Sequence, residues 1–121
     1  ALGGYKRSHK ANGLKMKNFS DASIPHYLHL FQNAALVITS SFHGTAFALN
    51  FGRPLVSIVP GNGDDRQTTL MNELGVEHCA VRVGDALDRI NPFYNVEAEQ
   101  LRLAEMRNSS LNWVSEKLCI I

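Results

Sequence analysis

The order of apolar and polar positions along the chain predicts helices that alternate with short strands. Apolar residues recur at helical spacing between Ile24 and Phe31, after the capping candidates Asp21 and Ser23, which predicts a helix over about residues 23–33. Residues 35–39 are apolar and partly β-branched, a pattern typical of a strand covered on both faces in a parallel sheet. A helix followed at once by a buried strand is the first sign of an α/β fold.

The middle of the chain repeats this alternation. Small and apolar side chains at residues 46–49 favour a short helix, which Gly52 and Pro54 bring to an end. Residues 55–59 then form a second apolar, β-branched run. We expect this run to be a buried strand beside the first.

The last part of the chain predicts one more strand between two helices. Acidic residues before Arg66 can cap a helix over 66–74, and Gly75 supplies its C-terminal stop. Residues 79–83 predict a third strand, and residues 96–118 a long helix whose Asn-Ser-Ser patch at 108–110 favours a kink or break. Its expected inner face comprises Leu101, Met106, Leu111, Trp113, Val114 and Leu118.

Together these elements predict an α/β, three-layer Rossmann-like domain with a small parallel sheet and right-handed crossovers. We assign residues 1–20, rich in Gly, Lys and Asn, to a lead-in, linker or edge strand, and residues 21–121 to the domain. The chain lacks the strand, glycine-rich turn and helix that usually open a nucleotide-binding fold. We therefore expect a chain truncated on its N-terminal side.

Composition narrows the function classes. Twelve Lys and Arg against eleven Asp and Glu give a charge of +1, which offers no general attraction for nucleic acid or an anionic membrane. Cys79 and Cys119 belong to no C-x-x-C pair, so neither a metal knuckle nor a redox motif is indicated and reduced thiols are expected. The sequence contains no apolar run of about 20 residues that would span a bilayer.

The candidate chemistry lies in the Ser40–Thr45 motif, which follows the first predicted strand. Ligands of open parallel sheets bind outside the carboxyl ends of the strands. Two serines, an imidazole, a glycine and a threonine at a helix start make a credible site for an anion. An alternative interpretation remains open: Ser41 or Thr45 caps the helix, Gly44 relieves a tight turn and His43 is a structural imidazole.

The run from Asn33 to Val56, with Ser-Phe-His-Gly-Thr at its centre, resembles the signature segment of the polysaccharide pyruvyl transferase family. The resemblance covers about residues 20–83 and implies a two-domain fold similar to type-B glycosyltransferases, of which this chain would supply the C-terminal half. It also implies transfer of a pyruvyl group from phosphoenolpyruvate to a sugar hydroxyl, in the biosynthesis of a cell-surface glycan.

The resemblance implies that His43 is the catalytic acid or base. Several members carry an arginine two residues before this histidine, where the present chain has Ser41. Arg66, after the loop that contains Asn62, is the nearest candidate for the missing cation, against the alternative of a solvated first-turn residue. The expected donor-binding residues are Ser40, Ser41, Gly44, Thr45, Asn62 and Arg66.

No cofactor and no metal are expected, because phosphoenolpyruvate is itself the donor substrate. The expected partners are a sugar or lipid-linked saccharide acceptor, a missing N-terminal domain of the same protein and, through exposed apolar surface, a second copy in a homodimer. Nucleic acid is not expected. The implied location is the cytoplasm, with peripheral attachment at the inner face of the membrane as an alternative.

Two other functions remain open. The same architecture serves glycosyltransferases and sugar-nucleotide enzymes, and Ser41 in place of the arginine favours that alternative. An isolated half of a cleft enzyme would be inactive and would behave as a non-catalytic assembly module. The remaining notable residues are expected to be structural, and they are His26, His29, Phe42, Asp64, Asp65 and His78.

Overall fold

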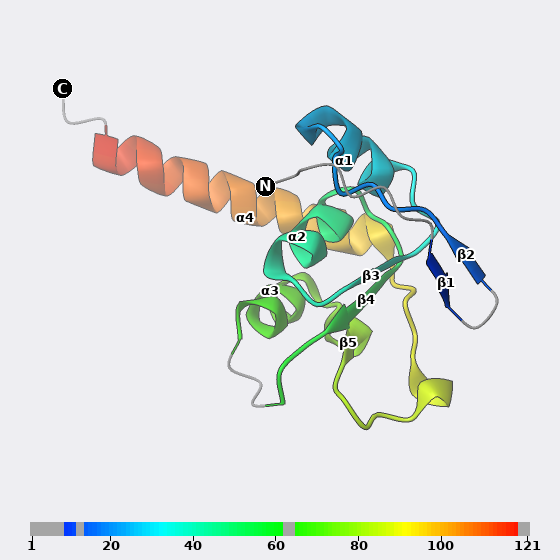
Figure 1. Cartoon of the computed structure of the whole chain (residues 1–121). Helices are drawn as coiled ribbons and strands as arrows, with labels where there is room; N and C mark the ends of the chain where they lie inside the picture. The colour runs from blue at the N-terminus through cyan, green and yellow to red at the C-terminus, as the bar shows by residue number, and fades with distance from the viewer. Residues whose placement is uncertain (1–8, 12–13, 62–64, 119–121) are drawn as a thin grey trace. The chain divides into compact units, whose positions relative to one another are not determined.

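The computed structural model describes residues 9–11, 14–61 and 65–118 (Figure 1). It contains two compact units, residues 1–30 and 31–121. The division falls later than residue 20, where the sequence placed the end of the lead-in. In the first unit, β1 (His9–Ala11) and β2 (Leu14–Met16) form an antiparallel pair.

Helix α1 (Ile24–Gln32) confirms the first predicted helix. It begins after Ser23, whose hydroxyl accepts a hydrogen bond from the backbone N–H of His26 at 3.3 Å. The ring of His26 meets that of Phe19 edge-on at 5.4 Å. These contacts fit the structural role expected of His26.

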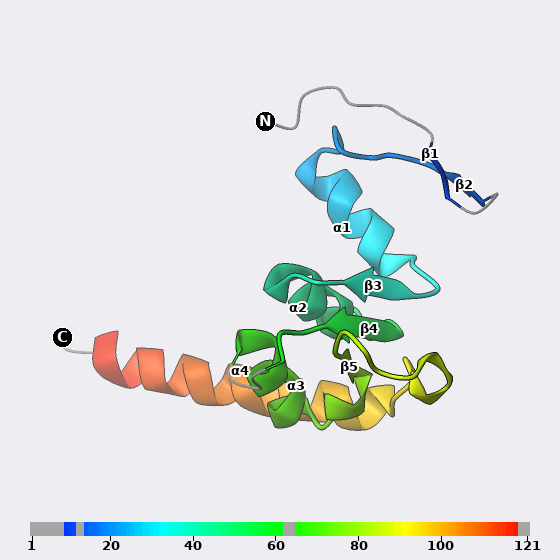
Figure 2. The ribbon, with the colours of Figure 1, turned by 60° about the horizontal axis from the view of Figure 1, so that its bottom comes forward.

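The second unit contains a three-stranded parallel sheet in the order β3-β4-β5 (Figure 2). The strands are β3 (Val37–Thr39), β4 (Leu55–Ile58) and β5 (Ala80–Val81). In register, Val37 lies opposite Leu55 and Ser57 lies opposite Ala80. The α/β fold class with a small parallel sheet is therefore confirmed.

Two helices cover the same face of this sheet. Helices α2 (Phe42–Asn50) and α3 (Arg66–Leu74) pack against each other, and residues of both bond to Ser57. Ser57 shares its face with Leu55, two positions before it on β4. On the opposite face Ile38 is 64% exposed and Ile58 39%. The core of the second unit comprises Val37, Ala48, Leu49, Leu55, Val59, Met71, Leu74, Val76 and Cys79.

The ends of α3 agree with the sequence prediction. Asp65 accepts hydrogen bonds from the backbone N–H and the hydroxyl of Thr68, at 2.7 and 2.8 Å. Gly75 ends the helix in the left-handed conformation, with a φ of 73°, which glycine adopts without steric cost. The cap that we expected of Asp65 is thus present, whereas Asp64 lies outside the described residues.

The third strand is shorter than residues 79–83, because a 3₁₀-helix (Glu77–Cys79) takes its first position. The backbone groups of β5 that face away from β4 are bonded locally. The Ala80 N–H donates to the carbonyl of Glu77, and the Arg82 N–H donates to the carboxylate of Asp85 at 2.8 Å. In return, the Asp85 N–H donates to the carbonyl of Arg82 at 3.0 Å.

A second 3₁₀-helix (Leu87–Arg89) precedes α4 (Val96–Leu118), which runs past α2 and α3 (Figure 1). Helix α4 continues through 108–110 without the predicted break. Its core-facing side consists of Glu99, Leu103 and Met106, at helical spacing. Of the predicted inner face, only Met106 packs against the core. Leu101 is exposed because it lies off the side formed by Glu99, Leu103 and Met106. The other four, Leu111, Trp113, Val114 and Leu118, are exposed in the second half of the helix, beyond its contacts with α2 and α3.

Candidate active site

The Ser40–Thr45 motif joins the carboxyl end of β3 to the start of α2, as its position in the sequence indicated. Only Ser40 and Ser41 form the connection, because α2 already begins at Phe42 rather than near residue 46. Ser41 is the N-cap: its hydroxyl accepts from the backbone N–H of Gly44 at 2.9 Å. Thr39 orients Ser41 in turn, since its hydroxyl accepts from the Ser41 N–H at 3.1 Å.

Gly44 allows β3 and α2 to approach closely. A Cβ atom at this position would overlap with the side chain of Thr39 and would lie 2.9 Å from the Ser41 hydroxyl oxygen. Gly44 is buried, so its closest neighbours are protein atoms. The motif therefore needs a glycine to accommodate the threonine at the end of the preceding strand.

Thr45 links the motif to the interior. Its hydroxyl donates to the Ser41 carbonyl at 2.9 Å and lies 2.7 Å from the hydroxyl of Ser57 on β4. The side-chain amide of Gln67 on α3 donates to the same Ser57 oxygen at 2.9 Å. Thr45 and Ser57 are both fully buried. The structure therefore gives the Thr45 hydroxyl a role in holding α2, β4 and α3 together.

The exposed side of the motif carries two rings from α2, and one guanidinium from α3 lies over one of them. His43 is exposed in the first turn of α2, and its ring contacts that of Phe42 edge-on at 5.7 Å. The guanidinium carbon of Arg66 lies 4.4 Å from the centre of the Phe42 ring. Arg66, at the start of α3, thus lies at the same edge as His43, as the sequence predicted for this residue.

Two further predicted residues remain. Ser40 is exposed at the start of the motif, and Asn62 lies outside the described residues. Another arginine, Arg53, precedes β4 at the opposite edge of the sheet, where its side chain donates to the Phe51 carbonyl at 3.2 Å. Phe42 is only half-buried and supports Arg66. Sequence reasoning missed this contact. The signal in the sequence is an aromatic residue in the first turn of a helix that begins at the carboxyl end of a strand, where ligands bind.

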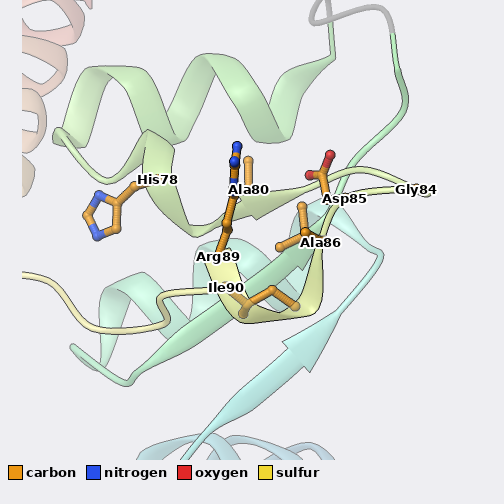
Figure 3. A pocket seen from close by; sticks show the side chains of 8 residues that line it. His78, Ala80, Gly84, Asp85, Ala86, Arg89 and Ile90 are labelled. Atoms are coloured by element: carbon orange, nitrogen blue, oxygen red, sulfur yellow. The ribbon is translucent and has the colours of Figure 1, made fainter.

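A cavity of about 410 Å³ lies beside β5, on another part of the second unit (Figure 3). The side chains of Asp85 and Arg89 extend in the same direction past Ala80, while His78 lies apart from them. His78 bonds through Nε2 to the Phe93 carbonyl at 2.7 Å, which agrees with its expected structural role. The polar side chains that line this cavity do not converge on one point, because His78 lies apart from Asp85 and Arg89. The Ser40–Thr45 motif therefore remains the candidate active site.

Within the described part of the chain, no helix is both long and apolar enough to cross a membrane. A comparison with protein families matches residues 5–62 to the polysaccharide pyruvyl transferase family. The matched segment contains the whole Ser40–Thr45 motif and ends before Arg66. No curated protein and no solved structure matches the chain. The match supports the resemblance found in the sequence: residues 5–62, just under half of the chain, are similar to the polysaccharide pyruvyl transferase family.

Proposed function

We propose that the protein carrying this chain transfers the pyruvyl group of phosphoenolpyruvate to a sugar hydroxyl of a cell-surface polysaccharide or of its lipid-linked precursor. The family match supports pyruvyl transfer in general. The observation that carries the specific proposal is that Arg66 and His43 both contact the Phe42 ring. A cation and a proton-transferring group then share the ligand-binding edge of the sheet.

Arg66 supplies the positive charge that the donor requires. Phosphoenolpyruvate carries a phosphate and a carboxylate, and a guanidinium binds either group through paired N–H donors. The first turn of α2, with its partial positive charge, lies at the same edge. In this proposal Arg66 takes the place of the arginine that several family members carry at the position of Ser41.

His43 transfers a proton during the reaction. Protonation of the methylene carbon of phosphoenolpyruvate leaves positive charge on C2, which the sugar oxygen attacks as its own proton departs. Loss of the phosphate then leaves the pyruvyl group on the sugar, and a second hydroxyl closes a ketal. An imidazole is suited to either proton step near neutral pH, and the exposed position of His43 leaves it accessible to both substrates.

We place the acceptor site between this chain and a further Rossmann-like domain of the same protein, on the cytoplasmic side of the membrane. In this arrangement the exposed side of the Ser40–Thr45 motif faces the acceptor and the further domain. Expression of the chain together with the reading frame around it tests the arrangement. Acceptor-dependent turnover by the chain alone would contradict it.

Release of inorganic phosphate from phosphoenolpyruvate in the presence of a saccharide acceptor tests the proposed reaction. Thermal shift measurements with phosphoenolpyruvate and with nucleotide sugars identify the donor, because a ligand raises the melting temperature according to the ratio of its concentration to its Kd. We expect stabilisation by phosphoenolpyruvate. Stabilisation by a nucleotide sugar alone would assign the site to a glycosyltransferase.

Replacement of His43 by alanine tests its role. Loss of a proton-transferring side chain lowers turnover by about 10²- to 10⁴-fold, and we expect little change in melting temperature because His43 is exposed. His26→Ala, which removes an imidazole from α1, is the matched control and should retain turnover. Full activity of the His43→Ala protein would remove His43 from the mechanism.

A further inference from the structure

Phe42 connects the two residues to which the proposed function gives chemical roles. It occupies the first position of α2, immediately before His43, and its ring is half-buried. The guanidinium carbon of Arg66 lies over the ring at 4.4 Å. His43 meets the same ring at 5.7 Å, with the two ring planes 75° apart.

An exposed arginine in the first turn of a helix normally samples many side-chain conformations, and binding an anion then requires most of them to be given up. Attraction between a cation and the face of an aromatic ring favours the conformations in which the two are in contact. A guanidinium on an aromatic face keeps its N–H groups available, because they point outward in its own plane. Contact with Phe42 thus restricts Arg66 without occupying its donors.

The backbone positions of the two residues are fixed relative to each other by the buried bonds beneath them. Gln67, which follows Arg66, bonds to Ser57 on β4, and Ser57 bonds to Thr45 in the first turn of the helix that carries Phe42. The ring and the guanidinium therefore project from two helices that are bonded through the same strand residue.

We propose that Phe42 is a positioning residue, whose ring contacts His43 and holds the Arg66 guanidinium at the same edge of the sheet, oriented to receive the anionic group of the donor. This proposal rests on the proposed function. It replaces the expectation that Phe42 is an ordinary core residue. Phe42 acts through Arg66, so its loss should weaken donor binding more than it slows the chemical step.

A double-mutant cycle in the protein carrying this chain tests the proposal. Phe42→Leu should raise the KM for phosphoenolpyruvate by about 2- to 5-fold, the range expected for loss of one exposed cation–π contact, with a smaller change in kcat. Phe42→Tyr and Phe42→Trp, which keep an aromatic face, should restore the wild-type KM. In an Arg66→Gln background, Phe42→Leu should have no further effect on KM, because the two residues act as a unit.

A second measurement reports on the contact itself. Protons of the Arg66 side chain should show upfield NMR shifts from the Phe42 ring, and these shifts should be lost in Phe42→Leu and kept in Phe42→Tyr. Melting temperatures of all variants identify any that do not fold, and the tyrosine and tryptophan variants then carry the test.

The outcomes separate the two proposals. Absence of phosphoenolpyruvate turnover in the wild-type protein overturns the proposed function, and the donor role of Phe42 with it. Turnover in the wild type with an unchanged KM in Phe42→Leu overturns the positioning role alone. An equal effect of Phe42→Leu with and without Arg66 would show that the ring contacts the substrate directly and would also overturn it.

Discussion

The hydroxyl oxygens of Thr45 and Ser57 lie 2.7 Å apart in the interior of the second unit. A hydroxyl has one proton to donate, and that of Thr45 goes to the Ser41 carbonyl. Ser57 must therefore donate to Thr45, while it accepts from the amide of Gln67. The result is a chain of hydrogen bonds with one direction, from α3 through β4 to the residue that caps α2.

Ser57→Ala tests the contribution of this chain of bonds to stability. The change removes the donor to the Thr45 hydroxyl, which still donates to the Ser41 carbonyl, and one of the two acceptors of Gln67. Each hydrogen bond contributes about 0.5–1.5 kcal/mol, so loss of both costs about 1–3 kcal/mol. We expect the free energy of unfolding in urea to fall by that amount. Thr69→Ala on the exposed side of α3 is the control, with an expected change within about 0.5 kcal/mol. Equal losses in the two variants would contradict the proposed importance of the buried bonds.

Gly44→Ala tests the close approach of α2 to β3. The added methyl group overlaps with the Thr39 side chain, and overpacking of this kind costs about 1–3 kcal/mol. Gly61→Ala is the matched control, because a Cβ there meets no atom within 4 Å. Thermal unfolding should show a lower melting temperature for Gly44→Ala only. A stable Gly44→Ala protein would mean that Thr39 can move aside without cost.

Asp65 should make the stability of α3 depend on pH. The hydrogen bond from the Thr68 backbone N–H is the main cause that holds the pKa of the Asp65 carboxyl below its ordinary value; desolvation opposes it, and the Thr68 hydroxyl lowers the pKa further. A lowered folded-state pKa means that the contribution is present above the unfolded pKa and is lost as the pH falls through the folded pKa. Asp65→Ala should therefore be less stable than wild type at neutral pH, and the difference should close in acid.

Urea unfolding at a series of pH values measures this difference. Asp88→Ala, at an exposed position before α4, serves as the control. A difference between Asp65→Ala and wild type that stays constant down to strongly acidic pH would rule out the carboxylate as its cause.

Glu99 should affect the pH dependence of stability in the opposite direction from Asp65. Its carboxyl is 1% exposed and its Oε2 atom has no hydrogen-bond partner among the described residues, while Gln100 donates to Oε1 at 2.8 Å. Burial raises the pKa of this carboxyl, and the Gln100 hydrogen bond and the charge of Arg107 oppose the shift. A carboxyl with a raised pKa stabilises the fold most below its unfolded pKa, and this contribution is lost as the pH rises through the folded value.

Glu99→Gln should consequently be more stable than wild type above neutral pH, and the two should converge in acid. Chemical denaturation at several pH values checks this, with Glu97→Gln in the exposed part of the same turn as the control. A wild-type protein that gains stability over Glu99→Gln as the pH rises would contradict a raised pKa for the buried Glu99 carboxyl.

Local patterns in the sequence were sufficient to predict most of the fold. The caps of α3 are visible as Asp65 and Gly75, and the β-branched runs before and after α2 correspond to β3 and β4. The ends of α4 also agree with the prediction, whereas its inner face does not. Which residues of a long helix are covered depends on the side that faces its neighbours and on the number of turns that they contact, and both are tertiary properties.

The candidate site was predicted in position but not in detail. The order of strand, motif and helix placed His43 and Arg66 at one edge of the sheet. It did not show that Thr45 is buried against Ser57, or that the Arg66 guanidinium lies over the Phe42 ring. Both relations join residues that are far apart in the sequence, and spacing along one helix or strand cannot encode them.

The local bonds on the outer side of β5 determine where this sheet can grow. The Glu77 carbonyl and the turn between Arg82 and Asp85 bind the backbone groups that a neighbouring strand would need. A paired edge is a poor template for strand addition, by the same chain or by another. A strand added next to β5 would have to break these local bonds, whereas a strand added at the other side of the sheet would lie next to β3, the strand that leads into the Ser40–Thr45 motif.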